Sequence, residues 1–457
     1  METTIAAIST AMSASGIGIV RISGEDAMNV IARIYRSKNG RKNIKEVKTH
    51  TIHYGYIYDG DETVDEVLVM VMRGPKTYTG EDTVEIDCHG GVYAMKRVLE
   101  TVLKNGAQVA EPGEFTKRAF LNGRLDLSQA EAVMDVIQAK SEVALKSSVE
   151  QLKGSVLRAV KEIRGKLLHH IAYIETALDD PEHFDLEGYP QELLEVAEEQ
   201  KKKVQKLLKS ADDGKMIQEG IRTVILGKPN AGKSSLLNFL VGEDRAIVTE
   251  IAGTTRDTLE EYISLHGISL RIIDTAGIRE TEDVVEKIGV EKARQMAEKA
   301  DLILYVVDSS QPLDENDKEI MDLLRGRKSI VIYNKTDLAS AVDMGRLREK
   351  TGSQVIPVSV VEETGIEDLE KAIREMFFQG EISFDDEVYI TNARHKTALE
   401  EAEKSLEMVT ESIEAGMPED FFSIDLMGAY EALGRILGES LGEDLVNEIF
   451  SKFCVGK

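Results

Sequence analysis

Apolar residues near the N-terminus come in short runs of the kind that form β-strands. Residues 18–22 read Gly-Ile-Val-Arg-Ile and residues 66–71 read Glu-Val-Leu-Val-Met-Val, with glycines interrupting the sequence around them. One stretch, near residues 92–103, has instead the spacing of a helix. The pattern predicts a compact α+β domain over residues 1–118.

The spacing of apolar residues changes after Pro112. No proline occurs between Pro112 and Pro181, and apolar side chains recur there at steps of three and four, which places them on one face of a long helix. These residues are Val156, Val160, Ile163, Leu167, Ile171, Ile174 and Leu178. After residue 380 a second helical series follows, made of Ala402, Leu406, Val409 and Ile413. Helical blocks therefore flank the middle of the chain.

The middle of the chain alternates predicted strands with helical stretches. The strands are expected at residues 221–227, 270–274, 302–308, 330–334 and 355–359. This alternation is typical of an α/β domain with a largely parallel sheet. Residues 258–265 and 268–273 resemble an antiparallel hairpin, which would add one reversed strand.

A length of 457 residues suggests about three domains. The simplest architecture is a helical bundle made from both flanks, with the α/β domain inserted between them. We place the first helical part at residues 119–219, the α/β domain at 220–379 and the second helical part at 380–457. Two separate helical units are the alternative.

Composition restricts the possible partners and the compartment. A formal charge of -26 argues against a surface that binds nucleic acid throughout, although a local basic patch is compatible with it. The two cysteines, Cys88 and Cys454, are far apart, which favours a reducing cytosol over a disulfide framework. An acid follows Met1 where an export signal carries lysines, and no apolar run reaches the length of a membrane span. We expect a cytoplasmic protein that has neither a membrane nor DNA as a partner.

Residues 227–234 read Gly-Lys-Pro-Asn-Ala-Gly-Lys-Ser and match the phosphate-loop pattern G-x-x-x-x-G-K-[ST]. The match lies between a predicted strand and a predicted helix, where backbone amides and the helix N-terminus favour phosphate. Lys233 would neutralise the β and γ phosphates, and the Ser234 hydroxyl would bind Mg²⁺. The residues expected to contact the nucleotide here are Asn230, Ala231, Gly232, Lys233, Ser234 and Ser235.

Later motifs complete a GTPase of the Ras type. Residues 274–277, Asp-Thr-Ala-Gly, offer a carboxylate near Mg²⁺ and an amide near the γ-phosphate. Asp337, in Asn-Lys-Thr-Asp at 334–337, can accept two hydrogen bonds that guanine donates and adenine does not. The remaining predicted contacts in these motifs are Asp274, Thr275, Ala276, Gly277, Asn334, Lys335 and, in the base pocket, Ser359.

Residues 253–257, Gly-Thr-Thr-Arg-Asp, occupy the place of a switch loop, and Thr255 is the predicted second hydroxyl ligand of Mg²⁺. Ile278 follows the Asp-Thr-Ala-Gly motif, where Ras-type enzymes orient water with a glutamine. An isoleucine cannot hydrogen-bond, so another group must assist hydrolysis. The Asn230 side chain is placed to hold a monovalent cation beside the phosphates, and Arg256 is the rival source of positive charge.

Four segments together resemble the MnmE (TrmE) family of tRNA-modification GTPases, and the resemblance covers the whole chain. They are residues 111–120, 253–257, 274–280 and the terminal Phe-Cys-Val-Gly-Lys at 453–457. The resemblance implies a homodimer that works with the flavoprotein MnmG on tRNA. The product is an aminomethyl-type group, including carboxymethylaminomethyl, on carbon five of the wobble uridine.

The resemblance also implies that the N-terminal domain mediates dimerisation and binds formyl- or methylene-tetrahydrofolate as a one-carbon source. The matching residues are Arg21, Glu85, Arg124 and Lys457. Glu85 would suit the pterin's amino-pyrimidine edge and the cations would suit carboxylates. Taken without the family, these residues are surface charges or structural ion pairs. Cys454 is either a reactive catalytic thiol or a small apolar residue packed under a helix.

For hydrolysis, the resemblance implies a potassium ion held by Asn230 with Thr249, Ile251 and Thr254 of the loop 249–254. That loop would also contact GTP through Glu250, Ala252 and Gly253. Two GTPase domains would meet face to face to order it, and Glu286 would position water as a catalytic residue. The alternative for Glu286 is a solvated helix charge.

A ribosome-assembly GTPase that acts as an RNA-binding switch is the competing hypothesis, because it would need the same middle domain. Such a protein would be expected to carry a basic RNA-binding module at one end, and none is visible in the sequence.

Overall fold

The structure is a computed structural model that describes residues 3–40, 42–180, 182–183, 188–245, 261–265, 268–273, 289–378 and 388–456. The chain forms two compact units. The first consists of Met1–Met134, Gln151–Ala172 and Met427–Lys457, and the second of Asp135–Glu150 and Tyr173–Leu426.

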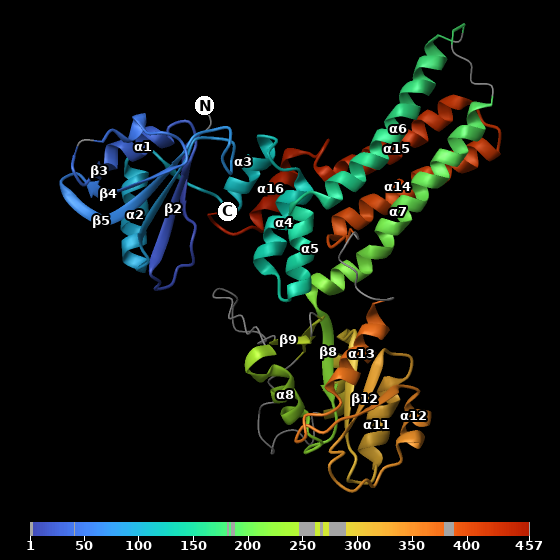
Figure 1. Ribbon diagram of the computed structural model, residues 1–457. Coiled ribbons are helices and arrows are strands. Elements are labelled where there is room, and N and C mark those ends of the chain that lie inside the picture. Colours follow the sequence, from blue (N-terminus) through green and yellow to red (C-terminus); the bar gives the residue numbers. More distant parts are fainter. Residues whose placement is uncertain are drawn as a thin grey trace. The chain divides into compact units, whose positions relative to one another are not determined.

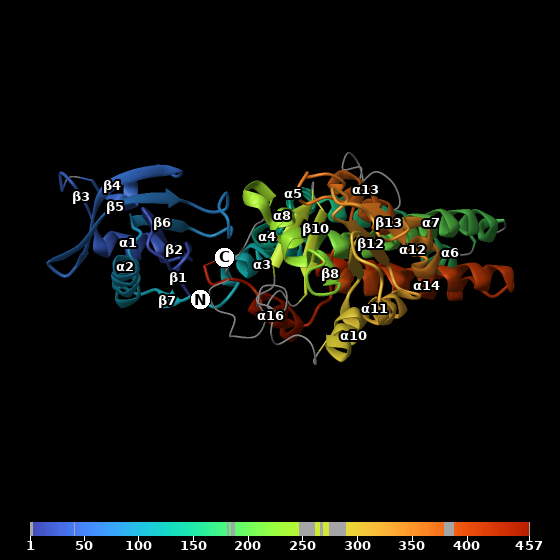
Figure 2. The same cartoon turned by 90° about the horizontal axis from the view of Figure 1, so that it is seen from below.

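The first unit contains a seven-stranded sheet in the order β3-β4-β5-β6-β2-β1-β7 (Figures 1 and 2). Its strands are β1 (Ile5–Ile8), β2 (Ile17–Ser23), β3 (Tyr35–Ser37), β4 (Thr51–Asp59), β5 (Glu62–Met72), β6 (Thr83–His89) and β7 (Gln108–Val109). Neighbouring strands are antiparallel except β1 and β7. Alternate residues such as Val69, Val84 and Ile86 point into one buried core, as period-two strands require.

Two helices cover that face of the sheet: α1 (Ala27–Ile34) and α2 (Val92–Lys104). The prediction of α2 is confirmed. The prediction of a single helix in this domain is wrong, because α1 buries Val30, Ile31 and Ile34 against the same core. An eight-residue, mainly apolar stretch is too short for its periodicity to separate a helix from a buried strand. A short 3₁₀ turn, η1 (Ile44–Glu46), follows.

Further helices are α3 (Glu114–Leu121), α4 (Leu127–Gln138), α5 (Glu142–Leu152), α6 (Ser155–Asp179), α15 (Glu419–Leu437) and α16 (Glu443–Ser451). Arg164 of α6 donates hydrogen bonds to Glu439, just after α15, at 2.7 and 2.6 Å, and its guanidinium lies over the Tyr430 ring. Leu127 and Phe450 pack together between α4 and α16. In this unit, therefore, segments from both flanks of the chain form one structure.

The same holds in the second unit, where α7 (Tyr189–Glu219) packs along α14 (Ala393–Glu414). Lys201 forms an ion pair with Glu407 at 2.8 Å, and Gln205 donates to Glu403 at 2.8 Å. The predicted bundle from two chain segments is confirmed, and the alternative of separate helical units is wrong. The described residues include no helix that is both long and apolar enough to span a membrane.

The inserted α/β part has a six-stranded sheet in the order β13-β12-β11-β8-β10-β9. Its strands are β8 (Ile221–Leu226), β9 (Glu261–Leu265), β10 (Ile268–Ile272), β11 (Leu302–Asp308), β12 (Ser329–Asn334) and β13 (Gln354–Pro357). All pairs are parallel except β9 with β10, which confirms the predicted sheet and its reversed strand.

Among the residues that the structure describes, helices cover both faces of this sheet (Figures 1 and 2). They are α8 (Lys233–Arg245), α10 (Gly289–Lys299), α11 (Glu315–Leu324), α12 (Met344–Thr351) and α13 (Ile366–Phe377). Leu240 of α8 and Ile373 of α13 belong to one core, whereas Ala297, Met321 and Leu347 belong to the core on the other face. This is a doubly wound arrangement, and such sheets bind ligands beyond the carboxyl ends of their strands.

Candidate nucleotide site

The loop between β8 and α8 has a shape that only glycine tolerates at two points. Gly227 has φ of 153°, and a Cβ there would lie 2.5 Å from the Val306 carbonyl oxygen. Gly232 has φ of 99°, and a Cβ there would lie 2.1 Å from the Asn334 side-chain nitrogen. The two glycines of the phosphate-loop pattern are therefore a steric requirement of this turn.

Protein side chains hold the carbonyl oxygens of this loop. The Lys233 ammonium donates to the carbonyls of Gly227 and Lys228 at 2.8 and 2.7 Å. The carbonyls of the two residues before Gly232 accept from the Asn334 amide and the Lys335 ammonium, both at 2.9 Å. A bound phosphate needs hydrogen-bond donors around it. Because protein donors already hold these carbonyl oxygens, the arrangement favours an anion at the loop. Burial lowers the pKa of Lys233, whose charge the loop carbonyls solvate.

The predicted base motif lies beside this loop. Asn334 ends β12, and Asp337 follows three residues later. The Ser359 hydroxyl, just after β13, donates to an Asp337 carboxylate oxygen at 2.7 Å. The fold thus brings Asn334, Lys335, Asp337 and Ser359 together with the phosphate loop, although they lie in three separate segments of the chain.

Asp308, at the end of β11, is a member of this group that the sequence patterns did not single out. Its carboxylate pairs with the Lys335 ammonium at 2.6 Å and accepts from the Ser310 amide and hydroxyl. Burial opposes the charge of Asp308, but the hydrogen bonds from Lys335 and Ser310 outweigh it and hold the pKa of Asp308 below its ordinary value. The sequence signal that could have identified Asp308 is its position at the carboxyl end of a central strand.

Several predicted site residues lie outside the residues that the structure describes. These are Thr249, Glu250, Ile251, Ala252, Gly253, Thr254, Thr255, Asp274, Thr275, Ala276, Gly277 and Glu286. Ser234 and Ser235 lie in the first turn of α8, directly after Lys233.

The residues predicted for folate form a second group within the first unit. Arg21 of β2 pairs with Glu85 of β6 at 2.7 Å, and its guanidinium faces the Tyr78 ring at 5.5 Å. Arg124 lies over the same ring at 4.8 Å. Arg21 also donates to the carbonyl of Gly456 at 3.3 Å, which brings the end of the chain beside β2. Lys457 itself lies outside the described residues.

The two cysteines differ in environment. Cys88 is buried on β6, and burial raises its pKa to about 11, which opposes formation of the thiolate. Cys454 is exposed, so the interpretation of this residue as a small side chain packed under a helix is wrong.

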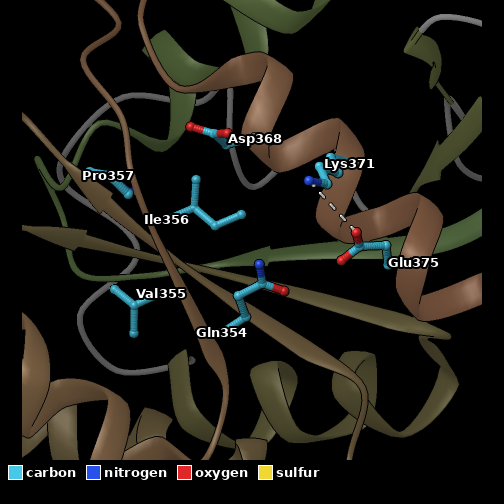
Figure 3. Close-up of a pocket in the computed structure, with 7 residues that line it drawn as sticks. All are labelled: Gln354, Val355, Ile356, Pro357, Asp368, Lys371 and Glu375. Atoms are coloured by element: carbon cyan, nitrogen blue, oxygen red, sulfur yellow. Dashed lines mark ion pairs between the residues drawn. The ribbon is translucent and has the colours of Figure 1, made fainter.

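A depression of about 250 Å³ lies between β13 and α13 (Figure 3). Its lining residues are Gln354, Val355, Ile356, Pro357, Asp368, Lys371 and Glu375. Lys371 and Glu375 face each other on α13 at 4.0 Å. None of the predicted nucleotide contacts is among these residues, so the depression is no candidate for the GTP site.

Comparison with known proteins finds similarity over nearly the whole chain. The family described as the MnmE helical domain matches residues 127–454, and the GTP-binding protein TrmE N-terminus matches residues 4–124. The tRNA modification GTPase MnmE of Lachnoclostridium phytofermentans is 59% identical over 454 residues, which cover 99% of each chain. The chain belongs to the MnmE family.

Other relatives support the same assignment. The tRNA modification GTPase MnmE of Geobacillus kaustophilus is 51% identical over 458 residues, again with 99% of each chain covered. As an MnmE-family protein, the chain is a GTPase of tRNA modification, with GTP as its substrate and tRNA as a partner. The ribosome-assembly alternative is therefore set aside. The G domain of the T. maritima FeoB iron transporter covers 34% of the chain at 28% identity with a TM-score of 0.27, which adds nothing to the assignment.

Proposed function

We propose that the loop after β8 binds the phosphates of GTP and that Asp337 and Ser359 bind guanine. The observation that carries this is the set of loop carbonyls held by Lys233, Asn334 and Lys335 beside the base motif. Lys233 would donate to the β and γ phosphates, and Ser234 and Thr255 would bind Mg²⁺. Ser234 fits this role because it lies in the first helical turn after the loop.

The second part of the proposal concerns the modification. A homodimer in the cytoplasm, acting with MnmG, would add the aminomethyl-type group to carbon five of the wobble uridine. GTP hydrolysis would drive the cycle, and a tetrahydrofolate would supply one carbon. The support is the whole-chain similarity to proteins named tRNA modification GTPases.

Reconstitution tests this division of labour. Purified protein and MnmG are mixed with unmodified tRNA, GTP and a tetrahydrofolate, and wobble nucleosides are analysed after digestion. We expect modification only when both proteins are present. Modification by this protein alone, or by MnmG alone, contradicts the proposal.

Formyl- or methylene-tetrahydrofolate would bind where Arg21, Glu85 and Arg124 converge near Gly456. The Arg21–Glu85 pair is already a matched donor and acceptor set, and the Tyr78 ring offers an aromatic surface beside it. Glu85 would accept from the pterin's amino-pyrimidine edge, and Arg21, Arg124 and Lys457 would meet the ligand's carboxylates.

Calorimetry with formyl-tetrahydrofolate tests this site. Glu85→Gln should weaken binding by about tenfold or more because a charged acceptor is lost, while GTP affinity stays unchanged. The matched control is Glu62→Gln, which removes a largely exposed carboxylate from β5 of the same sheet. Absence of heat from the wild-type protein at high ligand concentration contradicts the assignment.

For hydrolysis, we propose a potassium ion held by Asn230, Thr249, Ile251 and Thr254, with Glu286 positioning water. Of these, Asn230 lies in the described residues, and its φ of 61° is a strained conformation for a residue other than glycine, as is common at ligand sites. Its side-chain amide oxygen is a hard ligand of the kind that such a cation prefers. Cys454 would act as an accessible catalytic thiol, consistent with its exposure.

A further inference from the structure

The phosphate loop is connected to α11 by a lysine that the loop pattern does not assign. Lys228 occupies a variable position of the pattern, and its ammonium lies 2.7 Å from Asp317 and 3.1 Å from Asp314. Its side chain is 18% exposed, far less than that of a free surface lysine. Both carboxylates belong to the capping box at the start of α11.

Asp317 is the buried end of this connection, since its side chain is 1% exposed. One oxygen accepts from the Tyr305 hydroxyl at 2.7 Å, and the other accepts from the backbone amide of Asp314 at 2.9 Å. Tyr305 and that amide are neutral donors, whereas Lys228 brings the compensating charge. A buried carboxylate needs such a partner, so Lys228 is strongly restrained.

The backbone of the same residue holds the phosphate-binding lysine. The carbonyl of Lys228 accepts from the Lys233 ammonium at 2.7 Å. The side chain of Lys228 therefore restrains the position of an oxygen that positions Lys233. A displacement of Lys228 would change both the loop and the place of the lysine that meets the phosphates.

We propose that Lys228 is a positioning residue for nucleotide binding, which fixes the arc of the phosphate loop through its ion pair with Asp317. The inference rests on the proposed use of this loop for GTP phosphates. It adds a structural cause for the position of that loop. Helix α11, on one face of the sheet, restrains the loop that leads into α8 on the other face.

Binding of a fluorescent GDP analogue to the full-length chain tests the inference. Lys228→Met keeps the aliphatic stem and removes the charge, and we expect affinity to fall about tenfold because the loop loses its restraint. Lys228→Arg should retain most of the affinity. The control is Lys318→Met, which removes an exposed ion pair with Glu315 within α11. This variant should bind the analogue with unchanged affinity. Wild-type affinity in Lys228→Met overturns the inference.

A double variant separates positioning from stability. Lys228→Met leaves Asp317 buried without a cation, so the thermal midpoint should also fall. Adding Asp317→Asn removes that charge, although one of its two neutral donors loses its acceptor, and should restore part of the midpoint but not the affinity. If affinity recovers together with the midpoint, Lys228 acts only on stability and the inference is overturned.

Lys233→Ala distinguishes this inference from the proposed site. We expect it to abolish binding. Wild-type affinity in Lys233→Ala overturns both the site and the inference. Loss of binding in Lys233→Ala, together with wild-type affinity in Lys228→Met, overturns the inference alone.

Discussion

At the scale of single residues, the proposed nucleotide site consists of side chains that hold one another. Ser359 donates to Asp337, Asp308 pairs with Lys335, and Lys335 in turn holds the carbonyl of Asn230. Each group is therefore oriented before a ligand arrives, which lowers the entropic cost of binding.

Asp337→Asn tests base recognition. The carboxylate accepts from both guanine donors, whereas an amide offers one acceptor and one donor, which suits xanthine. GTP affinity should fall about a hundredfold and xanthosine triphosphate should become the preferred ligand in a competition assay. Asp343→Asn, at the N-cap of α12, is the control and should keep the wild-type preference. An unchanged preference in Asp337→Asn excludes this role.

Asp308→Asn tests the ion pair with Lys335 through pH. Because the pKa of Asp308 is lowered in the fold, its stabilising effect is complete above the ordinary carboxyl pKa. That effect is lost as pH falls through the lower folded value. At pH 7 the substitution should cost about 2 kcal/mol, and the difference in thermal midpoint should shrink below about pH 4.

The control for this pH profile is Asp322→Asn, which removes a largely exposed carboxylate paired with Arg325 on α11. It should show little effect at any pH. A difference between Asp308→Asn and wild type that stays constant down to pH 3 would exclude the titration of Asp308 as its origin.

At the scale of elements, the two long helices α6 and α7 each contain an interior glycine in a different environment. A Cβ at Gly165 of α6 meets nothing within 4 Å, whereas a Cβ at Gly214 of α7 would lie 2.4 Å from the Ile390 carbonyl oxygen. Residue 390 can therefore approach α7 closely only because Gly214 has no side chain.

The same substitution should thus have opposite effects at the two sites. Gly165→Ala should stabilise the protein by up to about 1 kcal/mol, because alanine loses less backbone entropy in a helix. Gly214→Ala should destabilise it by about 2 kcal/mol through steric overlap. Thermal unfolding of the two variants under identical conditions measures both, and a stabilised Gly214→Ala variant would contradict the described packing.

At the scale of the whole molecule, hydrolysis is proposed to depend on a cation and on a second GTPase domain, because Ile278 cannot orient water. GTP turnover in potassium should exceed turnover in sodium by roughly a hundredfold, and it should rise with protein concentration. Asn230→Ala should abolish the potassium response. Asn238→Ala, an exposed position on α8, is the control and should retain it. Equal wild-type rates in the two salts would defeat the proposal.

The sequence by itself determined the features that depend on neighbours along the chain. An apolar run, glycines and a helix start follow one another directly in this part of the chain. They made three elements predictable: the strand at 221–226, the loop at 227–232 and the helix from Lys233. The series in α6 and α14 was predictable for the same reason, since a period of three to four residues defines one helical face.

The tertiary structure alone decided which distant residues meet. Asp308 becomes a partner of Lys335, and Asp317 a partner of Lys228, only because parallel strands and the start of α11 converge at one edge of the sheet. Such pairs leave no periodic signal, because an ion pair requires only that two opposite charges approach, whatever their separation along the chain.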